Sequence, residues 1–197
     1  MSRPTAFTCF AASLFLLLVS LGCGPAVKPS VEPGPGIEPN AGAVPEKKVE
    51  LVELDYPAID ALNASTKGKV VVVDYWSTAC IPCIREFPKL VALDAKYDDD
   101  KLACISVSLD YYGGNTKVEE FREPVLEQLE KFGATFDNVL AADDTDVMIE
   151  KLKIDAPPAV FVFDRDGELA RKFIENEETT VDYEVIGELV AELVAKE

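Results

Sequence analysis

From residue 49 onward, apolar segments with the spacing of strands and of helices alternate along the chain. Two runs, residues 70–75 and 102–109, are apolar almost throughout, which is typical of strands buried on both faces of a sheet. The full predicted order is an edge strand at 49–54, a helix at 58–65, a strand at 70–75, a helix at 82–97, a strand at 102–109, a helix at 118–132 with a kink or break at Pro124, a strand at 138–141, a helix at 144–152, strands at 159–163 and 168–174, and a helix at 181–195.

This order predicts an α/β fold in which helices flank a central mixed β-sheet. The last two strands are separated by Asp164-Arg165-Asp166-Gly167, a turn signal that predicts an antiparallel hairpin. Neither an internal repeat nor a second domain is visible, and residues 49–197 have a length that suits one globular domain.

The N-terminal part of the chain is predicted to be a targeting segment. Arg3 precedes a mostly apolar run at 10–21, which is too short to span a bilayer comfortably and is typical of a signal peptide. The run ends in a small residue followed by Cys23, an arrangement that resembles the cleavage site of bacterial lipoproteins. We therefore expect residues 1–22 to be removed and Cys23 to carry a lipid. The alternatives are an ordinary secretory signal and an uncleaved anchor.

Residues 23–48 are a predicted linker, since they contain six prolines and four glycines. Such a segment cannot bury a core and favours the extended polyproline II conformation. We expect an exported protein, anchored to a membrane through its lipid and facing the periplasm or extracytoplasmic space.

The chain is strongly acidic, with 36 acidic and 19 basic residues and a net charge of −17. An anionic surface argues against a nucleic-acid partner. Solubility is the simplest interpretation of this charge, and we expect a monomer.

The strongest chemical signal is a pair of cysteines, Cys80 and Cys83, that follows the apolar run at 70–75 closely. Thiols at this spacing can open and close a disulfide with little backbone movement. At the start of a helix, the first sulfur lies near unpaired N–H groups that stabilise a thiolate. Strand, turn, C-x-x-C and helix together indicate a redox motif.

Half of a zinc site is the alternative interpretation of this cysteine pair. Zinc needs about four ligands, whereas the chain contains no histidine and has only one C-x-x-C. We therefore predict no metal and no cofactor other than the redox-active disulfide. Of the other cysteines, Cys9 would leave with the signal peptide, and Cys104 is expected to fill space in a buried strand.

The surroundings of the motif resemble those of thioredoxin-like proteins, and more narrowly the TlpA/ResA group of membrane-tethered thiol-disulfide oxidoreductases. Asp74 lies six residues before Cys80, where thioredoxins keep a buried acid, and Trp76 opens the active-site turn. Pro88 lies five residues after the motif, where thioredoxins kink the active-site helix, and Glu86 stands at an acidic position of the ResA-type redox site.

The resemblance covers roughly residues 50–197 and implies a thioredoxin-like fold. It also implies a strand-helix insertion between the active-site half and the half that carries a cis-proline. The segment between Leu109 and Ile154 is long enough to hold this insertion.

Four residues are predicted to be catalytic. The order of the thiols predicts that Cys80 is the nucleophile that attacks a substrate disulfide, and that Cys83 resolves the resulting mixed disulfide. Asp74 ends an apolar strand, so burial should raise its pKa and allow it to exchange a proton with Cys83; a carboxylate facing water is the alternative. Glu86 lies one helical turn beyond Cys83, and its alternative is an ordinary solvated glutamate.

A second predicted site lies just before the hairpin. Pro158 matches the cis-proline that thioredoxin-like proteins place opposite the redox pair, and the predicted substrate-binding residues are Trp76, Pro157 and Pro158. A plain loop is the alternative. Pro157 departs from the family pattern because it has no N–H to offer a bound strand, and Ala159 stands where threonine is common.

The absence of histidine also bears on the direction of the reaction. Strong oxidants of the superfamily carry a histidine between the cysteines, whose charge stabilises the thiolate. The motif Cys80-Ile81-Pro82-Cys83 therefore resembles the reducing members. We predict a reductase of disulfides in envelope proteins, itself reduced by an upstream thiol donor. A thiol peroxidase and a non-catalytic binding module with this fold are the alternatives.

Overall fold

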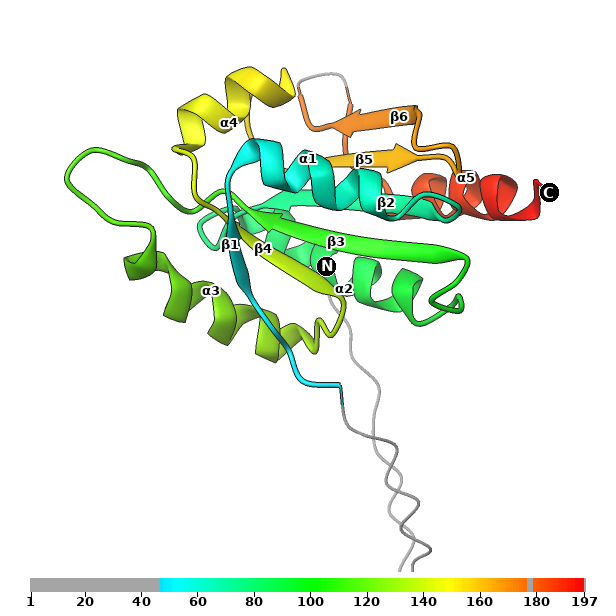
Figure 1. The fold of residues 1–197 in the computed structure, drawn as a ribbon, viewed down its shortest axis with the longest axis horizontal. Helices are drawn as coiled ribbons and strands as arrows, with labels where there is room; N and C mark the ends of the chain where they lie inside the picture. The colour runs from blue at the N-terminus through cyan, green and yellow to red at the C-terminus, as the bar shows by residue number, and fades with distance from the viewer. Residues whose placement is uncertain (1–46, 177–178, 197) are drawn as a thin grey trace, which may run out of the picture. The chain divides into compact units, whose positions relative to one another are not determined.

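Six strands form a mixed sheet in the order β1-β4-β3-β2-β5-β6 within the described residues, 47–176 and 179–196 of this computed structural model (Figure 1). The parallel part, from edge to centre, is β1 (Val52–Leu54), β4 (Asp137–Ala141), β3 (Leu102–Ser108) and β2 (Val70–Trp76). The antiparallel part continues from β2 through β5 (Ala159–Phe163) to β6 (Leu169–Ile174).

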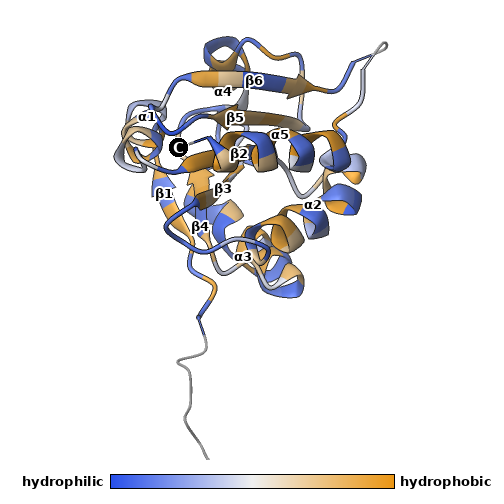
Figure 2. Cartoon of the chain, turned by 90° about the vertical axis from the view of Figure 1, so that its right-hand side faces the viewer, coloured by the Kyte–Doolittle hydropathy of each residue, from blue (hydrophilic) through white to orange (hydrophobic). Residues whose placement is uncertain are grey.

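Helices cover both faces of this sheet (Figure 1). One buried cluster joins the sheet to α2 (Ile81–Asp94), α3 (Glu119–Phe132) and α5 (Tyr183–Ala195). The other cluster joins it to α1 (Tyr56–Ser65) and α4 (Thr145–Leu152). Figure 2 shows that the central strands are mostly apolar, whereas the helices carry both apolar and hydrophilic residues, as expected for helices with one buried side.

Strand β2 decides where the chemistry lies, because all seven of its residues are buried. Side chains alternate between the faces of a strand, so Val72 and Trp76 face α2, α3 and α5, whereas Val73 faces α1 and α4. Asp74 is two residues from Val72 and two from Trp76, so it shares their face and points to the α2 side. A slip of one residue would move every side chain of β2 to the opposite face, and Asp74 away from Tyr183 on α5.

The predicted α/β fold is confirmed, and the ends of the predicted elements agree with the observed ones to within three residues. Of the kink or break predicted at Pro124, the break does not occur, because α3 continues from Glu119 to Phe132. Proline removes one helical hydrogen bond, but Val125 and Leu129 on the same helix are completely buried against the sheet. Their burial, at about 1.5–3 kcal/mol for each side chain, offsets that loss.

Helix α3 and strand β4 form the predicted insertion, and β4 lies between β3 and the edge strand β1. No helix of the described part of the chain is both long and apolar enough to cross a membrane. The predicted signal peptide, the lipid-carrying Cys23 and nearly all of the linker lie outside the described residues.

Candidate active site

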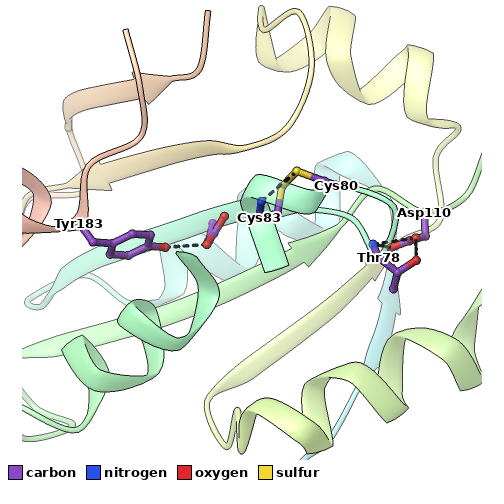
Figure 3. The surroundings of a disulfide bond; sticks show 6 residues. Thr78, Cys80, Cys83, Asp110 and Tyr183 are labelled. Carbon is purple, nitrogen blue, oxygen red and sulfur yellow. Dashed lines mark hydrogen bonds between the residues drawn. A yellow bond between two sulfur atoms is a disulfide. The ribbon is translucent and has the colours of Figure 1, made fainter. Parts of the chain in front are cut away.

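Cys80 and Cys83 form a disulfide at the N-terminus of α2, with 5.2 Å between their Cα atoms (Figure 3). Cys80 is the N-cap residue, and its Sγ accepts a hydrogen bond of 3.2 Å from the backbone N–H of Cys83. Cys83 is 3% exposed, whereas Cys80 is only half-buried. Cys80 therefore offers the accessible sulfur, in a position where an N–H group and the helix dipole stabilise a thiolate.

The loop that leads to Cys80 is held by a carboxylate that the sequence analysis missed. Asp110 is 2% exposed and follows β3 closely. Its two oxygens accept hydrogen bonds from the backbone N–H of Thr78 at 3.0 and 3.1 Å and from the Thr78 hydroxyl (Figure 3). The Ser108 hydroxyl also donates a hydrogen bond to Asp110. Because a buried polar group is costly to leave without its hydrogen bonds, Asp110 fixes the loop two residues before the nucleophile.

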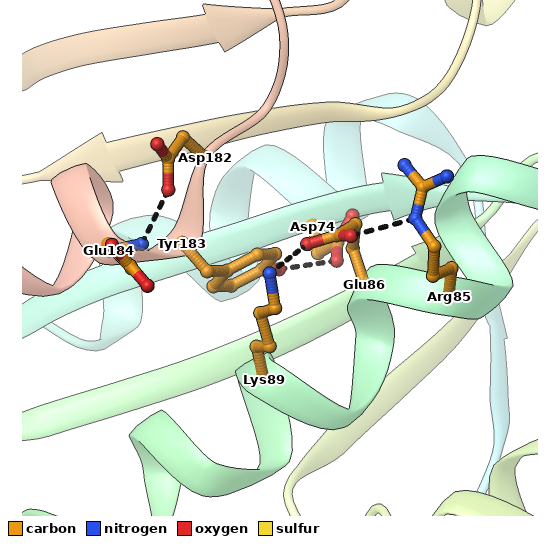
Figure 4. A network of polar contacts seen from close by, with 7 residues as sticks. All are labelled: Asp74, Arg85, Glu86, Lys89, Asp182, Tyr183 and Glu184. Atoms are coloured by element: carbon orange, nitrogen blue, oxygen red, sulfur yellow. Dashed lines mark hydrogen bonds and ion pairs between the residues drawn. The ribbon is translucent and has the colours of Figure 1, made fainter.

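Asp74 is buried on the sheet face that α2 covers, as Cys83 is. Its side chain is 4% exposed, and the hydroxyl of Tyr183 donates a hydrogen bond of 2.6 Å to its Oδ2 atom (Figure 4). Burial raises the pKa of Asp74 from 3.8 to about 7, although the hydrogen bond from Tyr183 favours the charged form. A carboxyl group with this pKa can both take up and release a proton near neutral pH.

Glu86 lies near this pair but differs from it in charge. Its side chain is 14% exposed and forms ion pairs with Lys89 and with the Nε atom of Arg85, the latter at 2.9 Å (Figure 4). The hydrogen bonds from Lys89 and then Arg85 lower its pKa below 4.5. Glu86 is thus held as a carboxylate, which suits an electrostatic role near Asp74 and Tyr183 better than a proton donor.

Trp76 was expected to bind substrate, but it lies in the core. Its side chain is completely buried and packs edge-on against Phe87 and Phe132, with ring centroids 4.9 and 6.2 Å away. A side chain with no exposed surface cannot contact a substrate, so the structure corrects this expectation: Trp76 supports the base of the active-site loop. The sequence pattern could not show this, because aromatic residues occur both in cores and at binding surfaces.

The peptide bond between Pro157 and Pro158 is cis. Tyr75 on β2 pairs with Ala159 on β5 in the antiparallel register, so Pro158 lies beside Trp76, where the loop to the cysteines begins. Pro158 is buried, and Pro157 is half-buried. The second site predicted from the sequence therefore lies next to the first.

Cys104 lies on β3 as a free thiol and is 2% exposed. Burial, followed by the effect of nearby Asp94, raises the pKa of this thiol well above 9.0. A buried thiol of this kind is inert. Across the described residues, no three His, Cys, Asp or Glu side chains are grouped so that they could hold a metal ion.

The sequence analysis did not identify Asp110 or Tyr183, and only Asp110 had a signal in the sequence. Asp110 comes at the end of an apolar strand, as Asp74 does. The carboxyl ends of parallel strands share one edge of a sheet, so this pattern could have identified Asp110. Tyr183 gave no signal, because a tyrosine at the start of an amphipathic helix, 109 residues from its partner Asp74, has many possible environments.

Residues 42–189 match the model of the Redoxin family. This span is most of the chain. The protein belongs to the Redoxin family.

Two similar proteins are named as thiol-disulfide oxidoreductases. The Redoxin chain is 28% identical over 134 residues to the thiol-disulfide oxidoreductase ResA of Geobacillus kaustophilus, covering 67% of this chain and 70% of the relative. It is also 28% identical to ResA of Geobacillus thermodenitrificans, covering 68% of this chain and 71% of that protein. Together with the Redoxin match, these relatives identify a thioredoxin-like thiol-disulfide oxidoreductase.

A solved structure of a thiol-disulfide isomerase from Corynebacterium glutamicum has the same fold. It superposes with a TM-score of 0.53 at 19% sequence identity, covering 68% of this chain and 86% of that chain. The similarity supports the thioredoxin-like fold of this Redoxin protein.

Proposed function

We propose that this oxidoreductase is an exported disulfide reductase, whose Cys80/Cys83 dithiol transfers two electrons to a disulfide of an envelope protein. One observation carries the proposal: a disulfide joins a half-buried Cys80 at a helix N-terminus to a nearly buried Cys83. Only one of the two sulfurs can meet a large substrate, and the other lies where it can attack the first.

The reaction follows from this arrangement in two thiol-disulfide exchanges. The Cys80 thiolate attacks one sulfur of the substrate disulfide, forming a mixed disulfide and releasing the other sulfur as a thiolate. Cys83 then loses its proton to Asp74 and attacks the Cys80 sulfur, which closes the Cys80–Cys83 bond and releases the second substrate thiolate. The substrate disulfide is reduced and the dithiol is oxidised. A dithiol donor restores the reduced pair by the reverse exchanges.

The reducing direction is supported by the charges near the disulfide. The chain has no histidine, so no imidazolium stabilises the Cys80 thiolate. Asp74 lies on the sheet face that α2 covers and, when ionised, opposes a further negative charge there. A weakly stabilised thiolate makes a dithiol the better electron donor.

The proposed place of action is outside the cytoplasm, with the domain tethered to a membrane. The support is in the sequence: the apolar run at 10–21, the small residue before Cys23, and the proline-rich segment that follows. At about 3.1 Å per residue in an extended polyproline conformation, this segment would let the active site reach envelope proteins tens of ångströms from the bilayer.

One experiment tests client, location and anchor together. The full chain with Cys83→Ser, isolated from the cell envelope of its native host, is expected to carry envelope proteins in disulfide linkage to Cys80, and its N-terminus is expected to be a lipid-modified Cys23 in mass spectra. The Cys80→Ser/Cys83→Ser double variant is the control, and it should carry none of these proteins. Partners confined to cytoplasmic proteins would contradict export, and an unmodified N-terminus at another residue would contradict the lipid anchor.

A further inference from the structure

The hydrogen bond between Tyr183 and Asp74 divides the two oxygens of a buried carboxyl group. The Tyr183 hydroxyl donates to Oδ2, whereas Oδ1 is buried and has no hydrogen-bond partner. Buried polar atoms are nearly always paired, so an unpaired one calls for an explanation. Cys83, which lies in the same buried cluster as Tyr183, carries no S–H while it is bonded to Cys80 and so cannot donate to Oδ1 in this state.

Tyr183 is held beside Asp74 by burial and by its place at the start of a capped helix. It is 6% exposed and is the first residue of α5, whose N-cap residue Asp182 accepts a hydrogen bond of 2.8 Å from the N–H of Glu184. Burial, followed by the nearby Asp74, raises the pKa of Tyr183 well above 10.0. The hydroxyl therefore keeps its proton and remains a donor throughout the pH range in which Asp74 titrates.

We propose that Tyr183 is a positioning residue for proton transfer: by engaging Oδ2 it leaves Oδ1 of Asp74 to take the proton of Cys83 when the mixed disulfide is resolved, and to return it when the dithiol is regenerated. The inference rests on the proposed proton role of Asp74. No electrons pass through Tyr183, whose O–H bond stays intact. The proton moves from the Cys83 sulfur to Oδ1, and the electron pair left on that sulfur forms the bond to Cys80.

The charged and titratable groups around Asp74 come from three elements. Tyr183 comes from α5 and Cys104 from β3, and α2 contributes Glu86 and its partner Lys89, together with Cys83. On the remaining side, β5 offers the apolar Val160, which pairs with Asp74 in the sheet. Cys104 stays protonated because burial raises the pKa of its thiol, and Glu86 stays ionised, so neither titrates with Asp74.

The test is the rate at which Cys83 attacks a mixed disulfide on Cys80, measured as a function of pH. Reduced protein is mixed with one equivalent of Ellman's disulfide reagent: the first coloured thiolate reports attack by Cys80, and the second reports attack by Cys83. In the natural protein, the second rate should rise with pH around the Asp74 pKa of about 7. Asp74→Asn should remove this rise.

Tyr183→Phe keeps the ring but removes the hydroxyl, so the charged form of Asp74 loses a hydrogen bond. The midpoint of the second rate should move up by about one pH unit, while the rate of attack by Cys80 changes less than about twofold. Tyr97→Phe, which removes the hydroxyl of a half-buried tyrosine just beyond α2, is the matched control and should leave both rates unchanged.

Replacing Tyr183 by 3-fluorotyrosine gives a test of opposite sign that does not depend on Tyr183→Phe folding. Its more acidic hydroxyl donates a stronger hydrogen bond, so the midpoint should move down. If Asp74→Asn removes the pH-dependent rise but neither change at Tyr183 moves it, the positioning role is wrong and the role of Asp74 stands. If Asp74→Asn keeps the rise, the proton role of Asp74 fails, and the inference fails with it.

Discussion

Replacing Cys80 by serine is expected to abolish disulfide reduction, whereas Cys83→Ser should react once and stall as a mixed disulfide. The half-buried Cys80 caps α2 and meets the substrate, while Cys83 is 3% exposed and can attack only the neighbouring sulfur. Serine keeps the size of the side chain but is no nucleophile towards a disulfide at neutral pH. Turnover of a small disulfide substrate and intact-protein mass spectra distinguish the two variants.

Cys104→Ala is the matched control for these cysteine variants. It removes the free thiol of the described residues, which is buried on β3 and has a raised pKa, and it should keep turnover near that of the natural protein. Alkylation of the reduced natural protein at neutral pH is expected to modify Cys80 first. Modification of Cys83 alone would show that the roles of the two thiols are reversed.

Asp74→Asn is expected to slow turnover at all pH values. Its effect on the free energy of unfolding should change sign with pH, from destabilising in acid to stabilising above neutral pH. Folding raises the pKa of Asp74 from 3.8 to about 7, so the folded state favours the protonated acid. The stability that this group contributes is therefore fully present below about pH 4 and is lost as pH rises through 7. A shift of about three pH units corresponds to about 4 kcal/mol.

Asparagine resembles the protonated acid and does not titrate, so the variant should lack this loss. Its amide can be left without a partner where Oδ1 is unpaired now, at a cost of about 1–3 kcal/mol. Unfolding by urea should therefore show a variant that is less stable than the natural protein near pH 4 and more stable near pH 8. Turnover should fall by about 100-fold, a typical effect of losing general acid–base catalysis. A stability difference that does not vary with pH would contradict the raised pKa.

The fold could be predicted because its signals are local. The C-x-x-C that begins α2 is separated by only three residues from the run that forms β2, and the turn signal at 164–167 favours a hairpin between β5 and β6. Burial on both faces leaves few choices for such strands. The same local character placed Cys80, Cys83 and Asp74 near one another, since they lie on β2 or at the start of α2. The position of Pro158 opposite them came from the resemblance to thioredoxin-like proteins.

What the sequence did not reveal depends on packing between distant segments. The hydrogen bond between Tyr183 and Asp74 spans 109 residues, and the one between Thr78 and Asp110 spans 32. Trp76 was expected at the substrate surface, but its position on β2 gives it the same face as Val72, beneath α2 and α3. Both faces of β2 are buried, so the sequence around Trp76 does not show whether its face lies beneath helices or at the substrate surface.

The proposed direction of electron flow depends on how strongly the protein stabilises the Cys80 thiolate. The N–H of Cys83 and the dipole of α2 favour the thiolate. The absence of histidine and the ionised form of Asp74 disfavour further negative charge. These effects partly cancel, which places the Cys80/Cys83 couple nearer the value of thioredoxin, about −270 mV, than that of the strong oxidant DsbA, about −120 mV.

The reduction potential of the Cys80/Cys83 couple is therefore the most direct test. The protein is equilibrated with glutathione buffers of known ratio, and its redox state is followed by the fluorescence of Trp76, the single tryptophan, or by alkylation of free thiols. If the protein is a reductase, its potential should lie within several tens of millivolts of about −270 mV. A potential above about −180 mV, in the range of protein disulfide isomerase, or a pair that does not exchange with glutathione at all, would contradict it.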